Sequence, residues 1–309
     1  MPNYVSLSNV FIDDILMSDG KMYIGVLGGA GVHAMAGARV WSESLGLIAN
    51  IGLDFEKDFL ILLKELGLDI SMLHKGQEKT TRAWQIFQPD EERIEIFRDK
   101  NNLVHQISLS EINIPNTYKN AKGYHFHFSG TLEKVLENLH IIHCFHPDIK
   151  IVMEPTVSEI GWGKIEFSKI LPLVDVFSPN LIEGQEITGN KIPEKIVVDL
   201  VNWGANCVAL RMGEQGSLLL SKGHEFAWIP PVSAKIVDVT GAGNAYLGGM
   251  LVGLCEGDNF IDAALKGAVS ASFAIEQFGV RLFDQDCIPE REIRFSIVKK
   301  QLNELMKRE

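Results

Sequence analysis

The chain has 309 residues, of which 46% are hydrophobic and 22% charged; these values are typical of a globular protein and argue against a disordered or fibrous one. The formal net charge of -11, without any run of Lys or Arg, argues against nucleic acid as a partner. Residues 1–16 carry acidic side chains too early for a signal peptide, and no apolar run could span a bilayer, so we expect a cytoplasmic protein that does not bind membranes.

Short apolar runs alternate with amphipathic stretches along most of the chain. Among them we expect strands over 4–12 and 45–52 and helices over 31–46 and 56–68. Four further strands, each leading into a helical segment, are expected over 123–130, 149–155, 174–180 and 205–213, and an amphipathic helix over 291–309. Such alternation predicts a parallel sheet covered by helices on both faces. Ligands then gather beyond the carboxyl ends of the strands.

Two segments break this alternation. Residues 13–29 and 80–100 alternate apolar and polar side chains around the turn sequences SDG and QPDEE, which predicts two hairpins. We expect lid segments at about 13–27 and 80–100 that form one small β-sheet standing off the core. The alternative is that they extend the main sheet at one edge.

The four cysteines, Cys144, Cys207, Cys255 and Cys287, lie far apart and form no C-x-x-C pair. This spacing argues against a zinc ribbon and against a disulfide framework. We expect buried, reduced thiols.

A cluster of small residues stands before a predicted helix in TGAGNAYLGG. The residues Gly241, Ala242 and Gly243 let successive backbone amides converge, and the helix that begins near Asn244 adds its positive end. The pattern predicts a site for an anion such as phosphate. A tight strand-to-helix turn is the alternative.

At these residues the chain resembles the ribokinase-like, or phosphofructokinase-B, family of small-molecule kinases. The matching motifs are DVTGAGN from Asp238, the Gly28-Gly29 pair, IGLD ending at Asp54, SPNLIEG, and RMGEQGSLLL. The resemblance covers almost the whole chain. It implies one α/β domain over 1–309, with a three-layer α/β/α core, a mostly parallel sheet and the small β-sheet lid. It also implies that ATP binds across the core and a sugar or nucleoside binds beneath the lid.

The resemblance assigns the acceptor-binding residues. Asp13, placed at the end of the first predicted strand, corresponds to the carboxylate that binds acceptor hydroxyls, and Gly28 and Gly29 allow close backbone approach. The alternative for Asp13 is a turn residue.

The nucleotide and metal residues are assigned in the same way. Asn180 and Glu183 match the family motif that orients water around Mg²⁺, and Glu154 joins this network. Glu183 could instead serve as a helix N-terminal charge. Asp238 is the candidate ligand for a monovalent cation, and Gly213 is the nucleotide-site glycine.

A late helical segment corresponds to the family's adenine pocket. Its matching positions are Ala268, Ala271, Ser272 and Ile275. Packing within a helical core explains the same residues equally well.

Three residues depart from the family pattern. Asn244 stands where the family has the Asp that takes the proton from the acceptor hydroxyl, and an amide cannot take it. His33 stands where an Asn is usual, and Arg211 where Thr is usual; Arg211 could pair with phosphate or with Glu154. Together they indicate an atypical branch, similar to the fungal maintenance-of-killer proteins, or a substitution introduced at 244.

Two functions follow from this pattern. The first is ATP-dependent phosphorylation of a hydroxyl on a sugar, nucleoside or related polyol, slowed by Asn244. The second is a pseudokinase that binds nucleotide or sugar in a regulatory role. A dinucleotide-dependent oxidoreductase is disfavoured because the first strand lacks G-x-G-x-x-G. A homodimer through the lid, with WQIF at 84–87 as a contact, is also expected.

Overall fold

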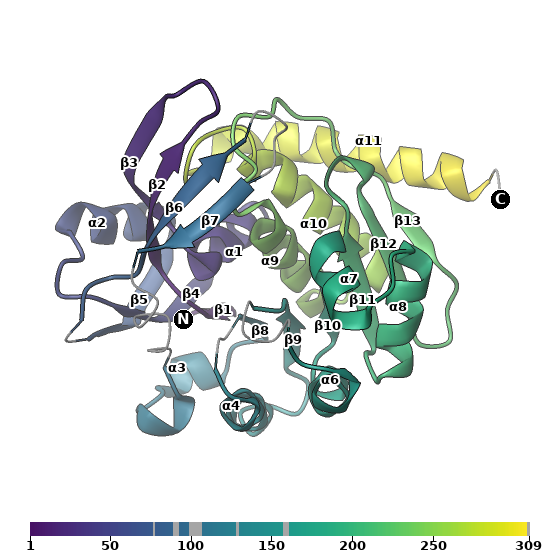
Figure 1. Ribbon diagram of the computed structural model, residues 1–309, viewed down its shortest axis with the longest axis horizontal. Helices are drawn as coiled ribbons and strands as arrows, with labels where there is room; N and C mark the ends of the chain where they lie inside the picture. The colour runs from purple at the N-terminus through teal and green to yellow at the C-terminus, as the bar shows by residue number, and fades with distance from the viewer. Residues whose placement is uncertain (77, 89–92, 99–106, 128–129, 157–160, 308–309) are drawn as a thin grey trace.

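Nine strands form one large sheet in the computed structural model, which describes residues 1–76, 78–88, 93–98, 107–127, 130–156 and 161–307 (Figure 1). These strands are β1 (Tyr4–Leu7), β4 (Leu45–Ile51), β5 (Leu68–Lys75), β8 (Gly123–Phe126), β9 (Lys150–Met153), β10 (Val176–Phe177), β11 (Cys207–Arg211), β12 (Ser217–Ser221) and β13 (Ala227–Ile229). Their order is β13-β12-β11-β10-β9-β8-β1-β4-β5. From β5 to β11 neighbouring strands are parallel, which confirms the predicted sheet.

The far edge of the sheet differs from the prediction. We expected the strand over 205–213 to lead into a helix, but β11 turns back into antiparallel β12, which pairs with antiparallel β13. Gly213 and Gly216 both have positive φ, 58° and 82°, and they form the tight turn that reverses the chain. The prediction was wrong because the apolar run after this turn was not assigned to a strand.

Helices cover both faces of the sheet (Figure 1). One layer contains α1 (Ala30–Arg39), α2 (Lys57–Glu65), α9 (Ala242–Cys255), α10 (Phe260–Ala274) and α11 (Ile288–Met306). The other contains α3 (Asn116–Lys119), α4 (Leu132–His143), α6 (Lys164–Ile170), α7 (Leu181–Thr188) and α8 (Pro193–Asn202). Because successive strand residues face opposite sides, the buried side chains divide into two separate apolar clusters. The three-layer core is thus confirmed.

A second sheet of four strands stands off the core and is called the lid here. It contains β2 (Phe11–Leu16), β3 (Met22–Gly28), β6 (Arg82–Phe87) and β7 (Arg93–Phe97), in the order β3-β2-β6-β7 (Figure 1). Two antiparallel hairpins join through the parallel pair β2 and β6, as expected from the two interrupted segments. Residues 89–92 and 99–100 of the expected lid lie outside the described residues.

The first predicted strand proved to be two. The run 4–12 contains β1 of the large sheet and the start of β2 in the lid, with a break at Asn9. The side chain of Asn9 accepts a hydrogen bond from the Ala30 N–H at 2.9 Å, and its carbonyl accepts the Gly31 N–H. The chain therefore bends at Asn9 to meet the start of α1, and Asp13 lies within a lid strand rather than at the end of β1.

The cysteines are free thiols, but they are not all buried. Cys207 is buried within β11, Cys255 and Cys287 are half-buried, and Cys144 is exposed at the end of α4. The expectation of four buried thiols was wrong because α4 turns Cys144 toward the surface. In the described part of the chain no helix has the length and apolar character to cross a membrane.

Candidate active site

Glu154 occupies the centre of a charged cluster at the carboxyl ends of the parallel strands. It follows the last residue of β9, and only 4% of its surface is exposed. His125 of β8 places Nε2 3.0 Å from Oε1, and Arg211 at the end of β11 places Nη2 3.3 Å from Oε2. Burial alone would raise the pKa of Glu154, but the hydrogen bond from His125 and the charge of Arg211 outweigh it and hold the pKa at about 2. Glu154 is therefore a carboxylate at neutral pH.

Asn244, on the first turn of α9, donates a hydrogen bond from Nδ2 to Glu154 Oε1. An ionised carboxylate can only accept hydrogen bonds, so the amide NH₂ must face it. The carbonyl oxygen Oδ1 of Asn244 consequently faces away from Glu154. It can accept a hydrogen bond from a hydroxyl group, but it cannot take the proton.

Arg211 carries a positive charge to the start of α9. Its Nη2 donates to the Ser178 carbonyl at 2.9 Å and lies 3.6 Å from Glu183 Oε2. Its Nη1 occupies the space that a Cβ on Gly243 would need, so only glycine leaves room for the guanidinium there. Nε is buried and has no hydrogen-bond acceptor among the described residues. This donor and the N–H groups at the start of α9, which lack partners within the helix, suit an anion, and the anion site itself remains a prediction.

Asn180 and Glu183 form the N-terminal cap of α7. The Glu183 N–H donates to Asn180 Oδ1 at 2.9 Å, and the Asn180 N–H donates to Glu183 Oε2 at 2.7 Å. This reciprocal pair is a capping box, which satisfies two N–H groups at the helix start. The alternative of a helix N-terminal role for Glu183 thus has a direct structural basis.

The candidate metal residues do not fit a directly bound ion in this arrangement. Both oxygens of Glu154 have partners, Glu183 is held by the cap and by Arg211, and no group of three or more metal-ligating side chains occurs among the residues that the structure describes. Asp238 Oδ1 accepts the Thr240 N–H at 2.8 Å and so shapes the turn into Gly241. Roles for Glu183, Glu154 and Asp238 through water or a monovalent cation remain predictions.

The candidate acceptor residues gather on the other side of the α9 start. A Cβ on Gly28 would collide with Asp13 Oδ2 and would lie 3.7 Å from His33 Nε2, and a Cβ on Gly241 would collide with the His33 ring. Asp13 Oδ1 accepts a hydrogen bond from Gln85 of β6 at 3.1 Å. The structure therefore brings Asp13, Gly28 and His33 together beside Gly241.

Gly29 has a structural reason to be glycine. It is the N-cap of α1 with φ 98°, and a Cβ there would collide with backbone atoms of residues 9–11. A side chain at this position would be strained and would have no room.

Two histidines of the site were not singled out from the sequence. His125 and His127 are two apart at the end of β8 and face the same way. His125 Nδ1 lies 2.9 Å from Ser6 Oγ, and His127 Nδ1 lies 3.3 Å from Asn9 Nδ2. Burial lowers the pKa of His127 to about 4, which keeps it neutral at pH 7. The signal was present, because a polar residue at the carboxyl end of a parallel strand is a candidate site residue.

The predicted nucleotide residues lie on α10 and on the β11–β12 turn. Ser272 is buried, and its hydroxyl donates to the Val269 carbonyl and accepts from Arg294 of α11 at 2.8 Å. This contact supports the core-packing alternative for Ser272. Ala268 is buried, whereas Ala271 and Ile275 are half-buried. Gly213 borders open space, because no described atom lies within 4 Å of the position that a Cβ on this residue would take.

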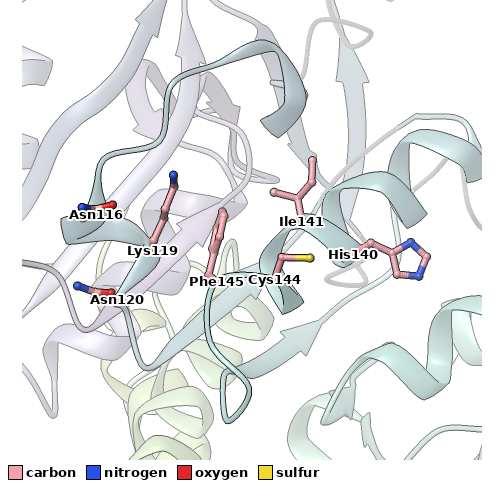
Figure 2. A pocket seen from close by; sticks show the side chains of 7 residues that line it. All are labelled: Asn116, Lys119, Asn120, His140, Ile141, Cys144 and Phe145. Atoms are coloured by element: carbon pink, nitrogen blue, oxygen red, sulfur yellow. The ribbon is translucent and has the colours of Figure 1, made fainter.

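A separate open pocket lies between α3 and α4 (Figure 2). It is lined by Asn116, Lys119, Asn120, His140, Ile141, Cys144 and Phe145. α3 leads into the start of β8, and α4 leads toward the start of β9, so the pocket is at the amino ends of these strands. The pocket and the Glu154 cluster therefore lie at opposite ends of the parallel strands.

The three-layer core with its lid has the fold of the ribokinase-like class, and sequence comparison identifies the family. The model of the pfkB family of carbohydrate kinases matches residues 15–287. The chain therefore belongs to the pfkB family.

Two curated relatives match over most of their length. The cytidine kinase of Thermococcus kodakarensis is 28% identical over 286 residues, which cover 90% of this chain and 98% of that protein. The 2-dehydro-3-deoxygluconokinase of Bacillus subtilis is 24% identical over 290 residues, with 89% and 87% covered.

Solved structures share the fold at low identity. A nucleoside kinase of Burkholderia thailandensis in complex with inosine has a TM-score of 0.75 and 17% identity, with 96% of this chain and 97% of that chain covered. A ribokinase II from E. coli, described as putative, in complex with ATP and Mg²⁺ has a TM-score of 0.75 and 19% identity, with 96% and 99% covered. These likenesses confirm the ribokinase-like fold with its lid.

Proposed function

We propose that this protein transfers the terminal phosphoryl group of ATP to a hydroxyl group of a sugar, a nucleoside or a related polyol. One observation carries the proposal: His33 and Arg211 meet the start of α9 at Gly241 and Gly243, two residues apart. The acceptor side, with Asp13, and the anion side are therefore adjacent at one helix N-terminus. The family membership and the nucleoside and sugar kinases among the relatives support the same reaction.

Each group has a distinct part in this reaction. Asp13 accepts hydrogen bonds from acceptor hydroxyls, and Asn244 Oδ1 orients the attacking hydroxyl. The first-turn amides of α9 and the Arg211 guanidinium stabilise the charge on the transferred phosphoryl group. Gly213, Ala268, Ala271 and Ile275 are proposed to contact the nucleotide. Magnesium, when it enters with ATP, would neutralise phosphate charge. ATP as the donor also favours a cytoplasmic location.

A substrate panel tests the proposal. Purified protein is incubated with ATP, magnesium and, separately, D-ribose, cytidine, inosine and 2-dehydro-3-deoxygluconate, and ADP and phosphorylated product are measured. We expect one acceptor to give stoichiometric product. The proposal would be contradicted if the protein binds ATP but forms no product with any acceptor, and if the Asn244→Asp/Glu154→Gln variant is equally inactive.

A second candidate function is binding without turnover. Asn244 favours it, because its amide is bonded to Glu154 and cannot take a proton. Calorimetry distinguishes the two functions: tight binding of ATP and of one acceptor together, with no product over hours, indicates a regulatory protein.

The lid also presents apolar side chains to its surroundings, and we propose that two copies of the chain associate through it. Met22 and Ile24 of β3 and Ile94 and Ile96 of β7 are 44% to 62% exposed. These residues, rather than Trp84, form the exposed face, since the Arg98 guanidinium covers the Trp84 ring at 4.8 Å. Light scattering should show a dimer that the Ile24→Glu/Ile96→Glu variant converts to a monomer. An unchanged mass for this variant would exclude the lid as the interface.

A further inference from the structure

We infer that His33 is the proton acceptor of the reaction, in place of the carboxylate that position 244 lacks. The inference rests on the proposed phosphoryl transfer and adds the group that activates the acceptor hydroxyl. It assigns to His33 a catalytic role that an Asn at this position could not perform.

The position of His33 carries the inference. His33 lies on α1 with 4% of its surface exposed, and its ring occupies the space beside Gly241 at the start of α9. Its Nε2 points toward the Gly28 side, where Asp13 Oδ2 also approaches. A hydroxyl held by Asp13 that attacks a phosphoryl group at the α9 amides therefore passes next to His33 Nε2.

Two other side chains at the start of α9 are unsuited as bases. Asn244 is an amide, and Glu154 is a carboxylate that already accepts from Asn244 and His125 and pairs with Arg211. Glu154 also lies on the side of Asn244 that faces away from Oδ1. Imidazole is the side chain whose ordinary pKa lies nearest neutral pH, so it suits general base catalysis there.

The proposed reaction is a single displacement at the terminal phosphorus of ATP. The acceptor oxygen forms a bond to the terminal phosphorus of ATP as the bond between that phosphorus and the bridging oxygen breaks, which releases ADP. The O–H bond of the acceptor breaks, and its proton moves to His33 Nε2. The imidazolium then returns the proton to solvent after the products leave.

The test compares His33→Asn in two backgrounds, with the acceptor that the substrate panel identifies. In the natural background, His33→Asn should lower kcat by about a hundredfold or more while KM for the acceptor changes less than about threefold, because Asn keeps a hydrogen bond but takes no proton. His140→Asn, the same change at an exposed histidine on α4 outside the site, should leave kcat unchanged.

The second background is Asn244→Asp/Glu154→Gln, which supplies a carboxylate at position 244. There His33→Asn should cost less than about threefold in kcat, because the introduced carboxylate then takes the proton. If His33→Asn lowers kcat by the same factor in both backgrounds, the inference is overturned. It is also overturned if His33→Asn in the natural background keeps a kcat within about threefold of the parent. Absence of product from every acceptor with the parent and with Asn244→Asp/Glu154→Gln would instead overturn the proposed function.

Discussion

In a protein that carries His33→Asn, exchanging the amide and the carboxylate between positions 244 and 154 should raise kcat by about a hundredfold, whereas Asn244→Asp alone should destabilise the protein. Asn244 donates to the ionised Glu154, so Asn244→Asp alone would place two carboxylates in contact. We expect this to cost about 2 to 4 kcal/mol in free energy of unfolding at pH 7. In the Asn244→Asp/Glu154→Gln variant the amide introduced at position 154 donates to the carboxylate at position 244, so the contact is kept and the net charge is unchanged. Urea unfolding and steady-state kinetics measure both effects.

Glu154→Gln alone is the control for this exchange. It removes the carboxylate without supplying a base, and kcat should not rise. If Asn244→Asp alone were as stable and as active as the double variant, the coupling between the two positions would be refuted.

Arg211→Met should lower the free energy of unfolding by about 3 to 5 kcal/mol and weaken ATP binding by about tenfold or more. The loss arises because Glu154, with a side chain only 5% exposed, would keep its charge without the guanidinium. Adding Glu154→Gln should recover most of the stability. It should not recover the ATP affinity, because the Arg211 guanidinium that is proposed to bind phosphate is still missing. Urea unfolding and calorimetry with ATP follow the two properties separately.

The matched control is Arg82→Met. Arg82 pairs with Asp54 at the same 3.3 Å separation, but these side chains are 27% and 28% exposed. Water screens such a pair, so we expect a loss of less than about 1 kcal/mol. Equal losses at the two positions would mean that burial of Glu154 does not determine the effect.

Much of the fold could be predicted because it depends on local patterns. Strand-to-helix alternation indicated the parallel sheet, and the interruptions at 13–29 and 80–100 indicated the lid. The division of 4–12 into two strands depends on the contact between Asn9 and Ala30, which are distant in sequence. The hairpin that leads into β12 depends on two glycines with positive φ, and the apolar pattern does not distinguish it from a following helix.

The residues of the candidate site were singled out one by one, but their contacts could not be predicted from the sequence. The sequence pointed to Glu154, Arg211 and Asn244 separately, and it allowed Arg211 to pair with Glu154. It could not show that Glu154 is bonded to Asn244, because the two are 90 positions apart. It also missed His125, whose ring supports Glu154 from a neighbouring strand. Spacing along the chain does not reveal which side chains from separate strands meet.

The glycines of the site have a consequence for how this protein can diverge. Gly28, Gly241 and Gly243 each provide the space that one side chain fills: Asp13, His33 and Arg211 respectively. A substitution at one of these glycines is therefore tolerated only together with a substitution of the side chain that fills its space. A descendant that acquires alanine at 243 could not keep the Arg211 side chain in its present place, and one that acquires alanine at 241 would displace His33. Lineages of this protein should vary at both members of a pair or at neither.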